Sequence, residues 1–281
     1  MFSESVGTDT AVAYAKLIGA LSKILSTEEA AKMVKAKILD ADLTDANSSR
    51  FAILTLNAFL KNSPQHILSA GLLHEVVDFV IEALQSPMAY VSDNATVATG
   101  KLLLSLKDVE QDDEVKQSIN KLINQLCITM SKPVSNSLDT RRLSLVVIRT
   151  ICRFEYDICI APNYDILAPS VFGNVRDPII PIKLASEKCF LAIFKLVEDE
   201  SSKLFNDWVS SKAGQATVST AAGAVLQMRS ITEYTKRVGH RLAGIERERI
   251  AAGGDRETMF SDEIEDEKEI WAIGGVDLGA E

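Results

Sequence analysis

The chain has 281 residues, of which 47% are apolar and only 6% aromatic, and its formal net charge is -9. An interior built mainly from Leu, Ile, Val and Ala suits helices packed on helices, so the composition favours an all-α fold. There is no run of 18 apolar residues, and no basic segment followed by an apolar one at the N-terminus, which predicts a soluble, unsecreted, cytoplasmic protein without membrane attachment.

Helical periodicity recurs along the chain, and several predicted helices carry their own start signals. The first is predicted over 9–25, with Ala13, Leu17, Ile18 and Leu21 on one apolar face. Ser26 and Glu29 have the spacing of a capping box and predict the start of a second helix over 27–39. Further helices are predicted over 48–61, 71–85, 92–106, 112–130, 138–154 and 163–175. Pro181 is placed to open one more, because the first helical turn tolerates a missing amide proton.

A short element recurs in the chain, in which a polar loop leads into a helix that begins with a basic or small residue and an apolar run. Its equivalent positions are Ala52, Ala98, Ser144 and Ala185, at intervals of 46, 46 and 41 residues. These intervals are typical of HEAT and armadillo repeats. They predict a HEAT-like α-solenoid of about four to five helix pairs over residues 1–210. The alternative is an irregular helical bundle.

The four cysteines are Cys127, Cys152, Cys159 and Cys189. They show no paired spacing and most lie among apolar residues, so we expect reduced thiols that behave as small core groups.

Charge is distributed unevenly towards the end of the chain. Residues 211–228 are dominated by Ser, Ala, Gly and Thr and are predicted to form a linker. Residues 229–256 carry seven basic and four acidic groups, whereas the last 25 residues carry nine acids and one lysine. Residues 229–281 are therefore predicted to form a charged C-terminal helix and an acidic tail.

The basic cluster in this region is the main candidate for binding a ligand, and it consists of Lys236, Arg237, His240, Arg241, Arg247 and Arg249. Lys236, His240 and Arg241 fall on adjacent turns of one helix, so they form a stripe that can meet phosphates or an acidic protein surface. The alternative is a solvated face whose cations form ordinary exposed ion pairs.

The acidic run from Asp262 to Glu269, followed by Trp271, also has two interpretations. It can be a docking peptide, in which charge steers the approach and the aromatic side chain anchors in a partner. It can instead fold back onto the chain's own solenoid and cap the terminal repeat, which would otherwise expose apolar surface.

The sequence contains no arrangement typical of catalysis. The three histidines lack metal spacing, and there is no HExxH motif, no Cys/His cluster and no phosphate-binding GxxxxGK[ST] loop. We therefore expect a protein that is not an enzyme and that has no cofactor, metal or small-molecule substrate.

Several segments resemble a known family. They include Arg176-Asp177-Pro178-Ile179-Ile180-Pro181-Ile182-Lys183, Tyr234-Thr235-Lys236-Arg237-Val238-Gly239 and Glu246-Arg247-Glu248-Arg249-Ile250-Ala251-Ala252-Gly253-Gly254-Asp255. Together with similar stretches near residues 14–19 and 51–57, they resemble the C-terminal end of the giant HEAT-repeat translational activator of the general amino-acid control pathway, fungal branch.

This resemblance implies a non-catalytic scaffold that sits on ribosomes and helps to activate the starvation-responsive kinase of initiation factor two alpha. Its implied partners are the ribosome and translation-control proteins, with the kinase-binding core upstream of the stretch represented here. Direct RNA contact stays open because only the basic cluster favours it. The alternative function is a HEAT- or TOG-type adaptor for transport or the cytoskeleton, since both classes use the same helix pairs.

Overall fold

The computed structural model describes residues 8–131, 137–153, 161–199, 236–237, 239–244 and 247. Over these ranges the regular structure is entirely helical, as the composition predicted. The elements in the ranges up to residue 199 are α1 (Thr8–Ser22), α2 (Thr27–Val34), η1 (Lys35–Leu39), α3 (Ala46–Asn62), α4 (Gln65–Ser69), α5 (Leu73–Leu84), α6 (Ala89–Ser105), α7 (Asp113–Ser131), α8 (Leu138–Arg153), η2 (Ala161–Asn163), α10 (Tyr164–Asn174) and α11 (Ile180–Asp199).

Each helix predicted between residues 9 and 175 has an observed counterpart whose ends differ by three residues or fewer, except that the one predicted over 27–39 is divided into α2, which ends at Val34, and the π-helix η1. The predicted capping box is confirmed, because Ser26 Oγ accepts the Glu29 amide at 3.4 Å and Glu29 Oε2 accepts the Ser26 amide at 3.0 Å. Hydrogen bonds from Ser26 lower the pKa of Glu29. The sequence did not predict α4, because five residues are too few to show a helical period.

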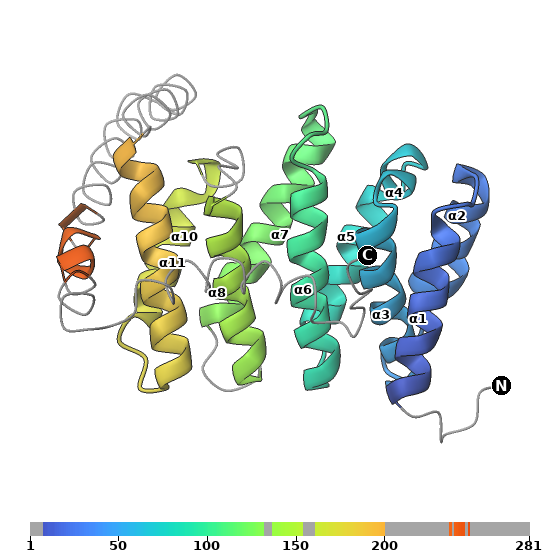
Figure 1. The fold of residues 1–281 in the computed structure, drawn as a ribbon, viewed down its shortest axis with the longest axis horizontal. Coiled ribbons are helices and arrows are strands. Elements are labelled where there is room, and N and C mark those ends of the chain that lie inside the picture. Colours follow the sequence, from blue (N-terminus) through green and yellow to red (C-terminus); the bar gives the residue numbers. More distant parts are fainter. Residues whose placement is uncertain are drawn as a thin grey trace, which may run out of the picture. The chain divides into compact units, whose positions relative to one another are not determined.

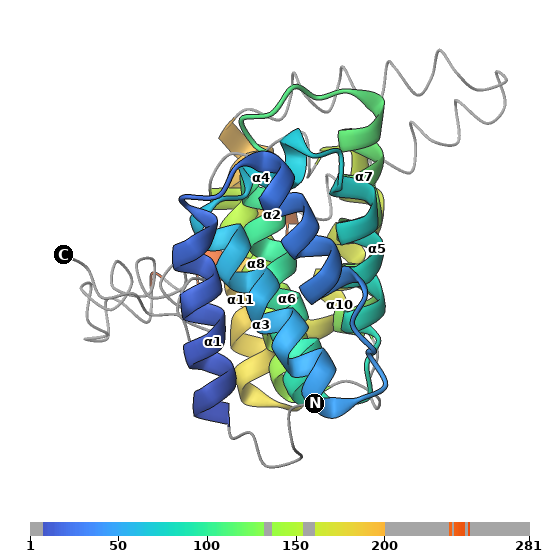
Figure 2. The same cartoon turned by 90° about the vertical axis from the view of Figure 1, so that its right-hand side faces the viewer.

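The described residues form two compact units, and the boundary between them lies inside α8, between Val147 and Ile148. In the first unit, α1, α3 and α6 lie side by side in one layer, while η1, α5 and α7 lie in a second layer (Figure 1, Figure 2). The start of α8 packs beside α6. The chain passes alternately from one layer to the other, which is the organisation of a helix-pair repeat.

The two central helices of the first layer are buried along most of their length. Residues 52–60 of α3 and residues 94–103 of α6 are buried without interruption. A helix with neighbours on both sides and a second layer beneath it has little surface left for water, so polar side chains are enclosed as well. Thr96 and Thr99 satisfy their hydroxyls by donating to the carbonyls of Ser92 and Ala95, at 2.9 and 2.8 Å.

The predicted apolar face of the first helix is wrong. Of its four residues only Ile18 is buried, whereas Leu17 is 56% exposed. The face of α1 that packs against α3 is instead formed by the small residues Ala11, Ala15 and Gly19 together with Ile18. Small side chains let two helix backbones approach closely, and periodicity alone does not reveal that preference.

At Gly19, α1 lies close against α3. A Cβ atom added there would lie 2.7 Å from Asn62 Nδ2 and 3.0 Å from Ala58 Cβ. We expect Gly19→Val to lower the free energy of unfolding by about 1–3 kcal/mol, because α1 must move away from α3. Gly173, whose added Cβ meets nothing within 4 Å, is the control site for the same substitution, and urea denaturation measures both. Equal losses at the two sites would contradict the close-approach argument.

In the second unit, α10 and α11 pack against each other. Ser186 Oγ donates to Val171 O at 2.6 Å, and the rings of Phe172 and Phe190 meet edge to face with centroids 5.9 Å apart. α11 begins at Ile180, so Pro181 lies in its first turn as predicted.

Three of the four cysteines, Cys127, Cys152 and Cys189, are buried and form no disulfide, which confirms the prediction for them. Cys159 and the predicted linker 211–228 lie outside the described residues. None of the described helices is long and apolar enough to cross a membrane.

Candidate functional site: a basic helical segment and two buried polar junctions

The predicted basic cluster lies in the second unit, on residues that are helical where they are described. Lys236, Arg237, His240, Arg241 and Arg247 are all exposed. The structure therefore brings these five together on one segment and presents them to solvent. Arg249 and Trp271, the remaining predicted interaction residues, lie outside the described residues.

The segment that carries the basic cluster has one buried side and one charged side. Leu242 is 8% exposed and Gly239 is buried, while Lys236 and His240 lie one helical turn apart, as do Arg237 and Arg241. Arg247 Nε donates to Ala243 O at 3.2 Å. The exposed cations can therefore contact phosphate or carboxylate groups while the buried side of the segment stays packed.

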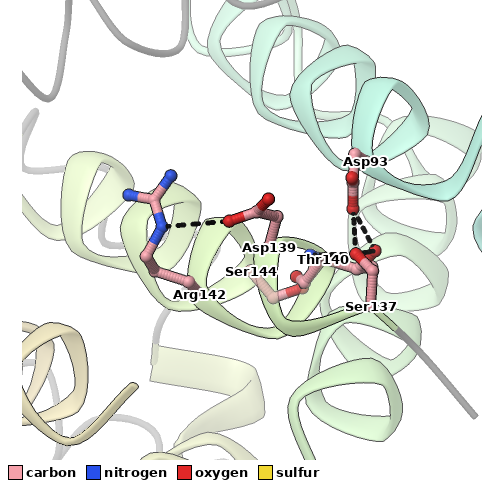
Figure 3. Close-up of polar contacts among 6 residues, drawn as sticks. All are labelled: Asp93, Ser137, Asp139, Thr140, Arg142 and Ser144. Atoms are coloured by element: carbon pink, nitrogen blue, oxygen red, sulfur yellow. Dashed lines mark hydrogen bonds and ion pairs between the residues drawn. The ribbon is translucent and has the colours of Figure 1, made fainter. Parts of the chain in front are cut away.

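Sequence reasoning missed the polar contacts at the start of α8, which we call the α6–α8 junction (Ser92, Asp93, Ser137 and Thr140). Asp93 on α6 accepts hydrogen bonds from the hydroxyls of Ser137, at 2.5 Å, and of Thr140 (Figure 3). Ser137 Oγ also accepts the Thr140 amide at 3.0 Å, so it caps α8. Ser92 Oγ lies 3.0 Å from Thr140 Oγ1. The carboxylate of Asp93 on α6 thus hydrogen-bonds to the residue that caps α8.

Two other charged residues of this region form a looser contact. Arg142 Nε lies 3.7 Å from Asp139 Oδ1, and the Asp139 side chain is 69% exposed (Figure 3). An exposed pair at this distance contributes little to stability. Asp93 is therefore expected to contribute more to the stability of this region than Asp139.

A second polar cluster lies between the two buried helices, and we call it the α3–α6 junction (Arg50, Asn57 and Lys61 of α3, with Tyr90, Asn94 and Lys101 of α6). Asn57 Nδ2 donates to Asn94 O at 2.9 Å, and Lys101 Nζ lies 3.5 Å from Asn57 O. Lys101 is only 1% exposed. This burial, with a smaller contribution from nearby Lys61, lowers the pKa of Lys101 to about 7.

At the other end of the α3–α6 junction, the Arg50 guanidinium lies over the Tyr90 ring, 5.0 Å from its centroid. Burial raises the pKa of Tyr90, and the charge of Arg50 opposes this shift. The contact is a cation–π pair between neighbouring repeats. Arg50 lies two positions before Ala52 of the recurring element, but nothing in the sequence singled out the contact between Arg50 and Tyr90.

The described residues contain no group of three or more His, Cys, Asp or Glu side chains that could hold a metal ion. The chemistry that the described sites offer is ionic contact and hydrogen bonding.

Comparison with known proteins places the chain in a family. The model of the family described as GCN1-like, C-terminal HEAT repeats, matches residues 50–202. The protein named eIF-2-alpha kinase activator GCN1 of Saccharomyces cerevisiae is 52% identical over 280 residues, which covers 95% of this chain. Protein ILITYHIA of Arabidopsis thaliana is 23% identical over 188 residues, or 65% of this chain. No solved structure matches.

The chain spans only 10% of the length of the yeast protein and 6% of the plant protein. The family match covers α3 to α11 and confirms both the predicted HEAT-like α-solenoid and the resemblance drawn from the sequence motifs. The chain belongs to the family of GCN1-like C-terminal HEAT repeats.

Proposed function

We propose that this chain is a non-catalytic part of a cytoplasmic translational regulator that promotes activation of the initiation factor two alpha kinase during amino-acid starvation. The observation that carries this proposal is the 52% identity, along 95% of the chain, to a yeast protein named as an activator of that kinase. Stacked helix pairs provide an extended surface for partners, and the described residues offer hydrogen-bonding and charged groups on it.

The kinase proposal is tested by a chimera. This chain replaces the segment that it matches in the yeast protein, and phosphorylation of initiation factor two alpha is measured during amino-acid starvation. We expect phosphorylation close to that of the unmodified yeast protein, because the two sequences are 52% identical over 280 residues. A chimera that is expressed at the normal level but gives no more phosphorylation than a deletion of the segment would refute the proposal.

We propose further that the basic cluster makes the chain's contact with ribosomal phosphates. The triple variant Lys236→Glu, Arg237→Glu, Arg241→Glu is expected to weaken co-sedimentation with ribosomes. It should also reduce the slope of log affinity against log salt by about three, roughly one for each lost phosphate contact.

The control variant reverses three exposed lysines of the first unit, Lys37, Lys107 and Lys116. This variant changes net charge by the same amount and should leave the salt slope unchanged. Equal losses in both variants would show that only net charge matters. Binding to tubulin in place of ribosomes would favour the adaptor function.

A further inference from the structure

One side of α1 carries a stripe of exposed apolar side chains, which we call the outer face of α1 (Ala13, Leu17, Ala20 and Ile24). Its members are separated by intervals of three or four residues, so they lie along one side of the helix. Ile24 continues the last turn of α1, because its amide donates to Leu21 O at 3.0 Å. Leu17 is 56% exposed and Ile24 is 78% exposed, so the stripe presents two large apolar side chains to solvent.

The outer face of α1 points away from the helices described so far. α1 lies at the end of the first layer of its unit, beside α3 (Figure 1, Figure 2). The outer face lies about 180° around the helix from Ala11, Ala15 and Gly19, which pack against α3. A helix that ends an α-solenoid normally presents a polar face to water. α1 instead has an apolar face on each side, which is typical of a helix inside a stack.

The charges beside the outer face of α1 favour an acidic binding partner. Lys16 and Lys23 are seven positions apart and directly precede Leu17 and Ile24, so they line one edge of the stripe. Residues 10–24 contain these two lysines and no acid. Two copies of α1 packed through this face would bring four cations together without an acid, which is unfavourable. A different helix with acids along the matching edge would pair with both lysines.

The dimensions of the outer face of α1 match a single facing helix. From Ala13 to Ile24 the stripe extends over about 16 Å, or roughly three helical turns. The other two helices of the layer, α3 and α6, have 17 residues each, so a helix of that kind covers the whole stripe. Small and large side chains alternate along the stripe, and the facing helix therefore needs small residues opposite Leu17 and Ile24.

We propose that the outer face of α1 packs against one more helix pair in a longer protein of this family. The contacting helix offers small and apolar side chains to Leu17 and Ile24 and acidic side chains to Lys16 and Lys23. This chain spans 10% of the length of the yeast relative, so most of that protein is available to provide the helix. α1 is then an inner helix of the stack, and this contact is independent of kinase activation.

Cysteine alkylation provides the first test, in the chain alone and in the chimera with the yeast protein. Leu17→Cys should react rapidly in the chain alone, because residue 17 is exposed. In the chimera the same residue should react at least about tenfold more slowly, since the facing helix covers it. Gln117→Cys, which is exposed on α7, is the matched control and should react equally in both proteins.

Two results of this experiment would overturn the proposal. Equal rates at residue 17 in both proteins would show that the outer face of α1 stays open in the longer protein. Protection in the chain alone that disappears on dilution would show that a second copy covers this face. Cys127, which is buried on α7, reports folding in both proteins, because its alkylation stays slow only while α7 is packed.

Charge reversal in the chimera provides the second test, with Leu17→Cys as the reporter. Lys16→Glu with Lys23→Glu should raise the alkylation rate at residue 17 severalfold, because acids of the facing helix then meet like charges. Lys107→Glu with Lys116→Glu reverses two exposed cations outside α1 and should leave that rate unchanged. If the two pairs of substitutions give the same rate, the facing helix carries no acids at these positions and the proposal is wrong.

Discussion

Replacing Lys101 by methionine is expected to raise the free energy of unfolding at pH 7 by roughly 3 kcal/mol, although the change removes a charged group. The lysine lies inside α6 with 1% of its surface exposed, and the charge of Lys61 lowers its pKa further. Methionine has a similar length and no charge. It therefore fills the same space without the free-energy cost of burying an ammonium group.

The cost of burying Lys101 should also appear in how the free energy of unfolding depends on pH. Burial lowers the pKa of Lys101 from 10.5 to about 7, so between these values the unfolded chain binds more protons than the folded one. The native protein should therefore gain stability as pH rises from about 7 to about 10.5, by up to about 1.4 kcal/mol per pH unit from this group. Lys101→Met should remove that slope.

Urea denaturation at several pH values measures both effects, and Lys107→Met is the control. Lys107 lies two positions after the last residue of α6 and is exposed, so its replacement should change neither the stability at pH 7 nor the slope. If Lys101→Met and Lys107→Met have the same pH profile, Lys101 is charged and hydrated in the folded chain, and the account of the α3–α6 junction given above fails.

Loss of the carboxylate in Asp93→Ala is expected to lower the free energy of unfolding by about 2 kcal/mol. Asp93 accepts hydrogen bonds from the hydroxyls of both Ser137 and Thr140, and Thr140 is fully buried. Without the carboxylate these hydroxyls lose a charged acceptor, and Thr140 has no water to replace it. In this variant the first turn of α8 should also open more often. Faster hydrogen exchange of its first amides would measure this opening.

Asp139→Ala is a closely matched control, because it removes the same group at the start of α8. The Asp139 side chain is 69% exposed and its contact to Arg142 is 3.7 Å, so the expected change is within about 0.5 kcal/mol. If the two variants are equally destabilised, burial of the junction is not the source of the effect.

Sequence patterns predicted the helices well because the required information is local. Ser26 and Glu29 define a helix start through their own spacing, and Pro181 does so through its missing amide proton. The repeat interval of 46 residues is also close to the 49 residues that separate the starts of α6 and α8, at Ala89 and Leu138. These signals depend on neighbours within one turn or on a simple repeat.

The packing faces and junctions depend on residues far apart in the sequence, and there the predictions failed or were missing. Leu17 was placed on the apolar face of the first helix, yet it is exposed and α1 packs through Ala11, Ala15 and Gly19. Asp93 and Asp139 are separated by the same 46 residues, but only Asp93 contacts a neighbouring helix cap. The predicted basic cluster is exposed where it is described, and its role in binding stays a prediction.

The three buried thiols have a consequence for the dynamics of the protein. Cys127, Cys152 and Cys189 are each at most 2% exposed and belong to three different helices, α7, α8 and α11. A buried thiol reacts with an alkylating reagent only when its surroundings open. In repeat proteins the individual repeats can open separately. The alkylation rate of each cysteine therefore reports how often its own helix opens. A comparison of the three rates would show the order in which α7, α8 and α11 open.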